Sequence, residues 1–462
     1  MNLTPFAIVV FLAGLLSSRD GLLRTLMLCC LFGATATLAL PGLGGAPITP
    51  AVMFLPFFLW RVLMDRGATS VLRQFDPPSA GFWLLMLAIW GVTTALFVPR
   101  LFAGMTMVFS TDRASTSALS VQFLPLRPIS TNATQSAYAI AGLLTFVAAR
   151  ALLQRDGLLA RFRDTVLLLG AVNIVVAVVD VAELYLGLPS VLSALRNANY
   201  AIMAGGEVGG LKRISGTFPE ASVFAAFTLP IFAFTASLWR DGVRRWYSGS
   251  VALGSFLLLI FSTSTTAYAA LVGLAAGLSV LALVRLLLGT APPRLGIAAL
   301  LLWGVAVATC LVLLVRNDLI IEVWRFFELT VVRKGESTSG LERGTWNSQA
   351  LRNFLETYGV GVGLGSARAS SFPLVLLSNL GVLGCLLFAA FLIQIVRSAF
   401  FRPSSPDSSV TTAAGLAVLA ALAAASISST VFDLGLAFYA YAAAATSGPS
   451  RRTVVTTRHS DG

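Results

Sequence analysis

The chain has 462 residues, of which 57% are hydrophobic and only 11% are charged, and its mean hydropathy is +0.85. A soluble globular protein is about 25% charged, so the composition excludes an ordinary soluble fold and predicts an all-α, polytopic integral membrane protein. The net charge of +12, from 32 Lys and Arg against 20 Asp and Glu, is attributed to short basic connectors that orient membrane helices. Nucleic-acid binding is not expected from it.

A helix that crosses a bilayer needs about 20 mostly apolar residues. Some 12–13 stretches are predicted to do so, and the first is read as a retained helix rather than a cleaved signal peptide. The whole chain, residues 1–462, is predicted to form one transmembrane domain. The predicted spans are 3–18, 22–40, 46–64, 80–98, 136–153, 165–188, 218–238, 247–262, 266–285, 295–315, 371–396, 411–430 and 434–447.

Basic residues in alternate short connectors predict the orientation, because such connectors remain on the cytoplasmic side. The tail, residues 448–462, is expected on the same side. The opposite side then receives three long loops, 99–135, 189–217 and 316–370. The first is rich in Ser and Thr and is read as a surface loop without chemistry. The basic connector residues are Arg61, Arg66, Arg73, Arg150, Arg155, Arg161, Arg163, Arg240, Arg244, Arg245, Arg285, Arg294, Arg397 and Arg402.

The second long loop ends in a basic pair, Lys212 and Arg213, shortly before an apolar run. Pro219 is expected in the first turn of the following helix, with Thr217 as its cap. Arg213 and Glu220 would then flank a helix N-terminus, which favours anions. The alternative is a snorkelling basic pair beside an ordinary first-turn glutamate.

The third long loop carries seven basic residues, and guanidinium groups bind phosphate in a fixed bidentate geometry. Residues 317–332 are amphipathic and are expected either on the membrane surface or packed over helix ends. A polar break over 334–340 is followed by a short helix from Glu342, with Trp346, Ala350, Leu351 and Phe354 on its apolar face. Alternating glycines over 359–365 allow close approach of backbone to backbone or to a ligand. The basic residues are Arg316, Arg325, Arg333, Lys334, Arg343, Arg352 and Arg368.

Ionisable residues inside spans are functional candidates, here Asp180 and Glu183, and Asp433 lies at an outer turn. The only histidine, His459, lies in the tail, and the four cysteines have no metal-ligand spacing. No metal and no cofactor are therefore expected, although the loop carboxylates Asp318, Glu336 and Glu342 leave an oxygen-ligated Mg²⁺ or Ca²⁺ open. The hydroxyl-rich turn 262–266 is expected to satisfy backbone groups.

Three segments together resemble the O-antigen polymerase and ligase family of bacterial polysaccharide assembly. One is the Arg-Ile-Ser-Gly-Thr-Phe-Pro-Glu element at 213–220, another is the 262–266 turn, and the third runs from Arg343 to Gly384. Ten residues separate Arg352 from Gly363, which is similar to an Arg/Gly pattern of the polymerases. The ligases carry a His-Asn pair where this chain has Ser370-Ser371, so the resemblance favours a polymerase.

The resemblance implies a helical fold related to the C-type glycosyltransferases, in a bacterial inner membrane with the long loops periplasmic. The implied reaction polymerises saccharide repeat units linked to polyprenyl pyrophosphate, without a metal. Expected partners are this lipid-linked oligosaccharide, membrane lipid, a chain-length regulator and a flippase. Transfer of a polymer to a lipid or protein acceptor, as by a ligase, and transport of lipid-linked saccharides stay open as alternatives.

Site residues are assigned from the matched elements. Preorganised arginines stabilise a leaving pyrophosphate, and we expect Arg213 and Arg343 in this role, with Glu220 as the base for the acceptor hydroxyl. The expected substrate-binding residues are Lys212, Arg352, Trp346, Gly361 and Gly363.

Overall fold

The computed structural model describes residues 4–40, 46–111, 121–187, 190–198, 206–208, 211–287, 338–401 and 407–448. Within these ranges the chain is mostly helical. The α-helices are α1 (Pro5–Leu16), α2 (Leu22–Cys29), α3 (Pro50–Arg66), α4 (Ala68–Leu72), α5 (Ala80–Leu101), α6 (Ser130–Leu153), α7 (Leu158–Tyr185), α8 (Ala221–Arg240), α9 (Arg245–Phe261), α10 (Thr265–Leu287), α14 (Thr338–Glu356), α15 (Phe372–Phe400), α16 (Ser408–Ser428) and α17 (Leu436–Thr446).

Seven of these helices are long and apolar enough to cross a membrane, namely α5, α6, α7, α8, α10, α15 and α16. Three further apolar helices, α1, α9 and α17, are shorter. The prediction of a polytopic membrane protein is therefore confirmed at this level. The predicted span 295–315, the amphipathic segment 317–332 and the tail 448–462 lie outside the described residues, apart from residue 448 itself.

The predicted span 22–40 is wrong, because helix α2 ends at Cys29. The chain then forms strand β1 (Leu38–Leu40), which pairs with β2 (Ala46–Ile48) in antiparallel register. Thr37 donates its backbone N–H to the Ile48 carbonyl over 2.8 Å, and its hydroxyl donates to the same oxygen over 2.7 Å. Polar residues that bond to backbone groups compete with a helix in this way.

The described residues contain two further β-hairpins, so the fold is not purely helical. Strand β3 (Met107–Ser110) pairs with β4 (Gln122–Pro125), and β5 (Glu207–Val208) pairs with β6 (Leu211–Lys212). The first of these lies in the loop 99–135, which is shorter than predicted because α5 extends to Leu101 and α6 begins at Ser130.

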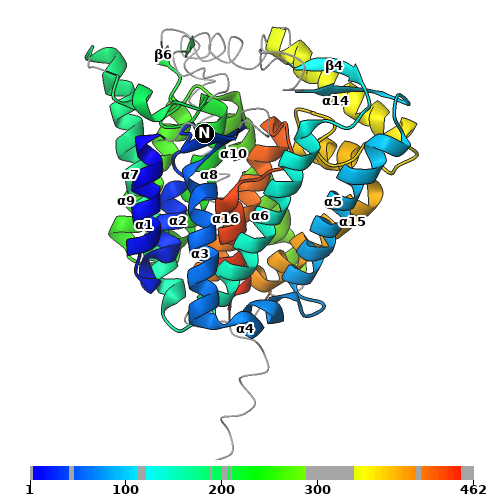
Figure 1. The fold of residues 1–462 in the computed structure, drawn as a ribbon. Coiled ribbons are helices and arrows are strands. Elements are labelled where there is room, and N and C mark those ends of the chain that lie inside the picture. The colour runs from blue at the N-terminus through cyan, green and yellow to red at the C-terminus, as the bar shows by residue number, and fades with distance from the viewer. Residues whose placement is uncertain are drawn as a thin grey trace, which may run out of the picture.

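The long loops and the basic connectors occupy opposite ends of the helix bundle. Helix α14 and strands β4 and β6 lie at one end, which we call the loop-bearing end, and α4 lies at the other (Figure 1). Ion pairs tie the basic connectors together: Arg19 and Arg155 lie 3.2 and 3.5 Å from Asp65, and Arg244 lies 3.2 Å from Asp164. The described parts of the long loops therefore lie at the same end of the bundle, and the side of the membrane that they occupy remains a prediction.

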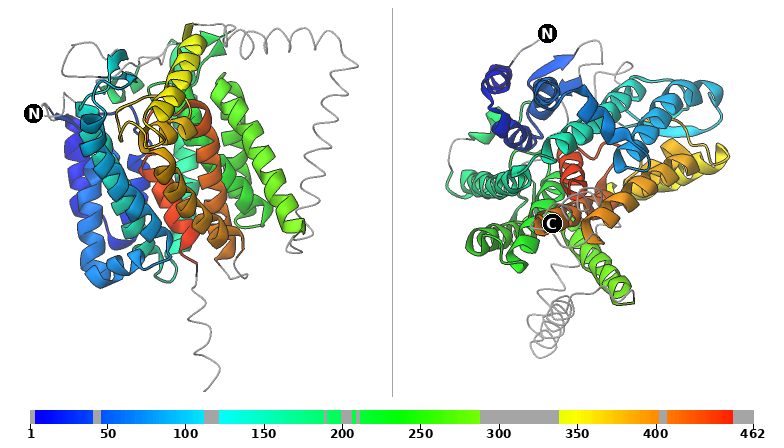
Figure 2. Two further views of the ribbon diagram at one scale, coloured as in Figure 1. Left: turned by 90° about the vertical axis from the view of Figure 1, so that its right-hand side faces the viewer. Right: turned by 90° about the horizontal axis from the view of Figure 1, so that it is seen from below.

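Helices α16 and α17 form the centre of the bundle, as the view along it shows (Figure 2). Helix α17 has the sequence LAFYAYAAAAT and all of it except Ala437 is buried. Small residues let helices approach closely, and Gly142 of α6 does so here, since a Cβ at that position would lie 2.3 Å from the Tyr439 ring. Because α16 and α17 are central, the connection between them lies at the centre of the loop-bearing end.

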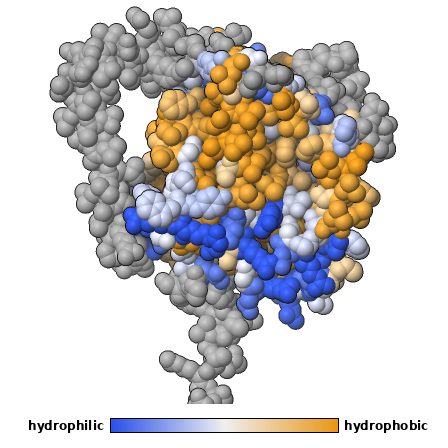
Figure 3. Space-filling view, turned by 90° about the vertical axis from the view of Figure 1, so that its left-hand side faces the viewer, coloured by the Kyte–Doolittle hydropathy of each residue, from blue (hydrophilic) through white to orange (hydrophobic). Residues whose placement is uncertain are grey.

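The outer surface has the pattern of a protein set in a membrane. An apolar band covers the face that includes α1, α7 and α9, and a hydrophilic belt lies below it, toward the end with the basic connectors (Figure 3). Trp239 and Trp246 are 51% and 91% exposed beside the basic residues of the connector between α8 and α9. Tryptophan prefers the membrane interface, and this placement is typical of such a boundary.

Candidate functional site

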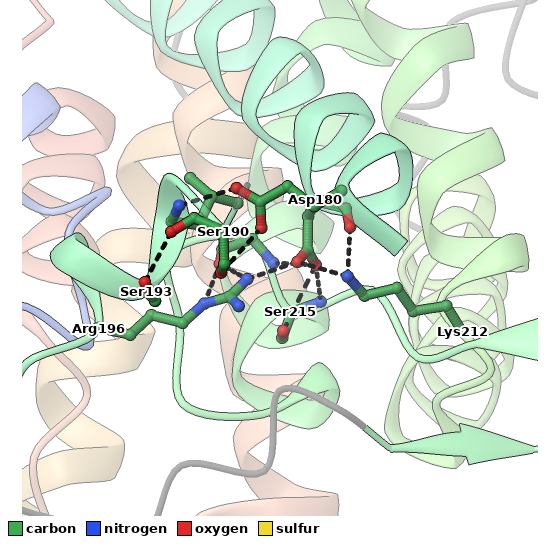
Figure 4. Close-up of polar contacts among 9 residues, drawn as sticks. Asp180, Ser190, Ser193, Arg196, Lys212 and Ser215 are labelled. Atoms are coloured by element: carbon green, nitrogen blue, oxygen red, sulfur yellow. Dashed lines mark hydrogen bonds and ion pairs between the residues drawn. The ribbon is translucent and has the colours of Figure 1, made fainter. Parts of the chain in front are cut away.

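A buried polar cluster at the loop-bearing end joins helix α7 to the second long loop. Its centre is Asp180, which lies in α7 and is fully buried. Asp180 Oδ1 accepts hydrogen bonds from Arg196 Nη2 at 2.5 Å and from Lys212 Nζ at 3.0 Å. Asp180 Oδ2 accepts from the backbone N–H groups of Ser215 and Gly216, both at 2.9 Å. Figure 4 shows these side chains converging on the carboxylate.

The two cations of the cluster share one carboxylate. The side chains of Arg196 and Lys212 are only 9% and 8% exposed, and Arg196 Nε also donates to the Gly216 carbonyl at 2.8 Å. Lys212 Nζ donates to the backbone carbonyl of Asp180 as well. Lys212, a predicted substrate-binding residue, is thus held inside the protein by Asp180, and we assign it to the support of the loop.

Arg213 follows Lys212 directly and has a different environment. Its backbone N–H donates to the Gly206 carbonyl at 2.9 Å, at the base of the β5–β6 hairpin. Its side chain is partly buried, and its Nε is buried with no hydrogen-bond partner. Within the described ranges no carboxylate forms an ion pair with Arg213. Arg213 thus differs from Lys212, whose charge is paired with Asp180.

The segment between Arg213 and α8 is not helical, so the predicted cap at Thr217 and the predicted helical position of Pro219 are wrong. Helix α8 begins at Ala221, and its N-cap residue is Glu220, in extended conformation. Thr217 donates its hydroxyl to the Leu31 carbonyl at 2.5 Å, beyond the end of α2. The Glu220 side chain bonds to Ser222 Oγ. Glu220 thus lies at the start of α8, whereas Arg213 precedes it across an irregular segment, and its place beside the helix N-terminus remains a prediction.

Helix α14 holds the other predicted arginines. It begins at Thr338, inside the polar break that the sequence predicts over 334–340. Arg343 is partly buried and Arg352 is exposed, and neither forms an ion pair with a described residue. Nine residues correspond to about 180° around a helix with 3.6 residues per turn, so the two point to opposite sides. In Figure 1, α14 and β6 lie on different sides of the loop-bearing end, and the described contacts include none between Arg213 and Arg343.

One face of α14 packs on the β3–β4 hairpin and the following loop. Ala350 is buried, whereas Leu351, predicted for the same face, is 46% exposed. Gln349 Nε2 donates to the Met107 carbonyl at 2.7 Å. The Trp346 ring lies 6.3 Å from that of Phe109 and 6.0 Å from the Arg368 guanidinium. The loop 99–135 was expected to be a surface loop without a role in the reaction. Through these contacts it helps to position α14.

The predicted substrate-binding glycines, Gly361 and Gly363, are buried and serve backbone packing. Their φ angles are +86° and +91°. Added Cβ atoms would lie 2.9 Å from the Asn379 backbone and 2.6 Å from the Thr94 carbonyl. The sequence left open whether these glycines allow close approach to backbone or to a ligand. The structure shows close approach to backbone.

Helix α15 is broken at Gly381, whose φ is +64° and ψ −161°, and the glycine-rich loop fills the break. The carbonyls of Ser378 and Asn379 accept the N–H groups of Val362 and Gly363, at 2.8 and 3.0 Å. Irregular backbone inside a membrane protein needs partners of this kind. The loop is therefore a rigid support for α14.

Buried amide side chains that the sequence analysis missed hold this loop in place. Asn379 Nδ2 donates to the Ala367 carbonyl at 2.9 Å, and Ala367 N donates to Asn379 Oδ1 at 3.2 Å. Asn132 Nδ2 donates to the Leu364 carbonyl and to Ser366 Oγ, both at 2.8 Å. Asn379, a polar residue within an otherwise apolar run, offered a signal, whereas Asn132 lies in a Ser- and Thr-rich stretch that offered none.

Among the residues that the structure describes, no three His, Cys, Asp or Glu side chains gather as metal ligands. Asp318 and Glu336, two of the loop carboxylates that left a metal open, lie outside the described ranges. Comparisons of the chain with protein-family models, with curated proteins and with solved structures found no match.

Proposed function

We propose that this protein is a membrane glycosyltransferase that polymerises saccharide repeat units linked to polyprenyl pyrophosphate, at the loop-bearing end of the bundle. The observation that carries the proposal is Arg213, a partly buried guanidinium whose buried Nε lacks a hydrogen-bond partner beside a net positive buried cluster. The motif resemblance at 213–220 supplies the reaction class.

The charges of the cluster favour an anionic ligand. Arg196 and Lys212 share the single charge of Asp180, so two cations and one anion leave an excess of one positive charge, and Arg213 adds another. Buried charges and buried donors are costly unless they are paired. A pyrophosphate offers several charged oxygens, and hydrogen bonds from arginine to phosphate are short and strong.

The outer surface of α7 favours a ligand with a lipid tail. Val175, Val178 and Leu184 are 61%, 57% and 45% exposed on the helix that carries Asp180. A polyprenyl chain can lie along this apolar surface while its pyrophosphate reaches Arg213. A water-soluble anion would need no such surface.

In the proposed reaction a hydroxyl of the acceptor unit attacks the anomeric carbon of the donor. The bond between that carbon and the phosphate oxygen breaks, and its electron pair leaves with the polyprenyl pyrophosphate. Negative charge develops on this oxygen in the transition state, where preorganised arginines act most strongly. Arg213 is the proposed donor to the pyrophosphate, and Arg343 is proposed to contribute from α14.

The test uses the purified protein in lipid nanodiscs, with farnesyl pyrophosphate as a short binding probe and lipid-linked repeat units from a host strain that lacks the gene. Arg213→Ala should weaken binding of the probe about 10- to 100-fold, because hydrogen bonds to charged groups contribute about 1.5–3 kcal/mol each. It should also abolish polymer. Arg213→Lys should fail too, since lysine cannot make a bidentate contact.

The matched control is Arg100→Ala, which removes an exposed arginine at the same end of the bundle, on α5. It should bind the probe and make polymer like the wild type. Normal polymer from Arg213→Ala would refute the proposal. Transfer of finished polymer to a lipid or protein acceptor would indicate a ligase, and movement of the intact lipid-linked unit across the membrane a transporter.

A further inference from the structure

The short connection between α16 and α17, residues 429–435, carries a carboxylate that the proposed function leaves without a role. Asp433 lies in this connection and is partly buried. Gly435 donates its backbone N–H to Asp433 Oδ1 at 2.9 Å. Within the described part of the chain, no lysine or arginine forms an ion pair with it. Asp433 thus differs from Asp180, which is saturated with donors.

The surroundings of Asp433 disfavour its charged form. The preceding Phe432 is buried, and its ring lies 6.2 Å from that of Phe372. Among the described residues, Asp433 interacts electrostatically with the thiol of Cys30, at the end of α2, and with the hydroxyl of Tyr439, in α17. Burial raises the pKa of the Asp433 carboxyl, and the hydrogen bond from Gly435 offsets this only in part.

The connection that carries Asp433 and the first turn of α17 are linked to both sides of the loop-bearing end. On the side of Arg213, Cys30, at the end of α2, contacts the Ala437 backbone of α17, and Thr217 is bonded to the adjacent Leu31 carbonyl. On the side of α14, Arg368 Nη2 donates to Thr430 Oγ1 at 2.7 Å, three residues before Asp433. Figure 2 shows the C-terminal helices at the centre of the bundle.

We infer that Asp433 is the general base that takes the proton from the acceptor hydroxyl. This inference rests on the proposed function. As the acceptor oxygen forms its bond to the anomeric carbon, its proton passes to the Asp433 carboxylate, and the electron pair of the breaking bond leaves with the pyrophosphate. The protonated Asp433 then releases the proton to water. Asp433 thus takes the role that the sequence assigned to Glu220.

A partly buried carboxylate without a cation suits this chemistry. A general base works best when its pKa lies near the working pH, and burial moves an aspartate in that direction. The structural alternative is that Asp433 only forms the turn that begins α17, through its bond to Gly435. An asparagine side chain can accept the same hydrogen bond but cannot take the proton, so the two roles are separable.

The experiment compares Asp433→Asn and Asp433→Ala with the wild type in the polymerisation assay, with binding of farnesyl pyrophosphate and thermal unfolding measured in parallel. A base of this kind contributes about 100- to 10,000-fold to the rate, so Asp433→Asn should lose at least about 100-fold in turnover. It should bind the probe as the wild type does, and its thermal unfolding temperature should be equal to that of the wild type or higher. Glu356→Gln, an exposed carboxylate at the same end, is the matched control and should remain fully active.

The outcomes separate the two proposals. If Asp433→Asn polymerises normally while Arg213→Ala does not, Asp433 is a turn residue only and the proposed function stands. If Asp433→Asn is inactive, folded and able to bind the probe, the inference is supported. If the wild type neither binds the probe nor makes polymer, the proposed function is wrong and the inference is overturned with it.

Discussion

Asp180 in α7 and Lys212 in β6 form a buried ion pair with 3.0 Å between Oδ1 and Nζ, although 31 residues separate them in the chain. The same carboxylate binds Arg196 and two backbone N–H groups. One side chain of a membrane helix thus binds four residues of the second long loop. The position of Arg213 depends on it, because Arg213 adjoins Lys212.

Replacement of Asp180 by asparagine should destabilise the protein strongly. It would leave Arg196 and Lys212 buried without an anion, and removing one partner of a buried ion pair costs about 3–5 kcal/mol. The thermal unfolding temperature in detergent should fall, and less protein should accumulate in the membrane. The control is Asp241→Asn, at the partly exposed pair with Arg240, which should change stability little. Wild-type stability of Asp180→Asn would contradict the role of the cluster.

The glycines of the loop before α15 should tolerate no side chain. In Gly363→Ala the new Cβ would lie 2.6 Å from the Thr94 carbonyl, at a φ of +91°, so both the contact and the backbone conformation oppose it. The left-handed conformation alone costs about 1–3 kcal/mol for a residue other than glycine. We expect a loss of folded protein, measured by size-exclusion chromatography after extraction.

Gly344→Ala is the matched control for the glycine prediction. Gly344 lies within α14, and nothing lies within 4 Å of its Cβ position. Alanine stabilises a helix by about 0.5–1 kcal/mol relative to glycine. This variant should therefore accumulate at least as well as the wild type. If Gly363→Ala and Gly344→Ala behave alike, the close approach at Gly363 does not limit folding.

The two arginines of α14 should differ in function. Arg343 is partly buried near the start of the helix, and Arg352 is exposed on its opposite side. Under the proposed function, Arg343→Ala should reduce polymer at least about tenfold, from the loss of one hydrogen bond to a charged group. Arg352→Ala should have a smaller effect. Polymer length and amount on gels of surface polysaccharide would measure both, and equal losses would refute the distinction.

The sequence was sufficient for the class of polytopic membrane protein and for the seven long apolar helices, because both follow from local hydropathy. It failed where distant residues decide the structure. Residues 30–40 are apolar enough for a span, but Thr37 bonds to Ile48 and Ala36 N donates to Asn197 Oδ1 at 2.7 Å. The partners of Asp180 were hidden for the same reason, since Arg196 and Lys212 reach it only in the folded loop.

The stability of the wild type should depend on pH through Asp433, and Asp433→Asn should remove this dependence. Burial raises the pKa of the folded carboxyl above its ordinary value. Below the ordinary value the folded and unfolded chains both carry the proton. As the pH rises from there, the unfolded chain releases its proton first, so stability falls until the pH exceeds the raised folded pKa. Asparagine does not titrate and retains the bond to Gly435.

Thermal unfolding of both proteins from pH 4 to pH 8 measures this effect. Other groups titrate equally in the two, so the difference in unfolding temperature isolates Asp433. The variant should be the more stable protein at pH 8, and its advantage should shrink toward pH 4. A constant difference across this range would mean that the carboxyl titrates normally and that its burial carries no cost. A gain in stability together with a loss of turnover is the combination expected of a residue retained for chemistry, because strain at a functional site is maintained at the expense of stability.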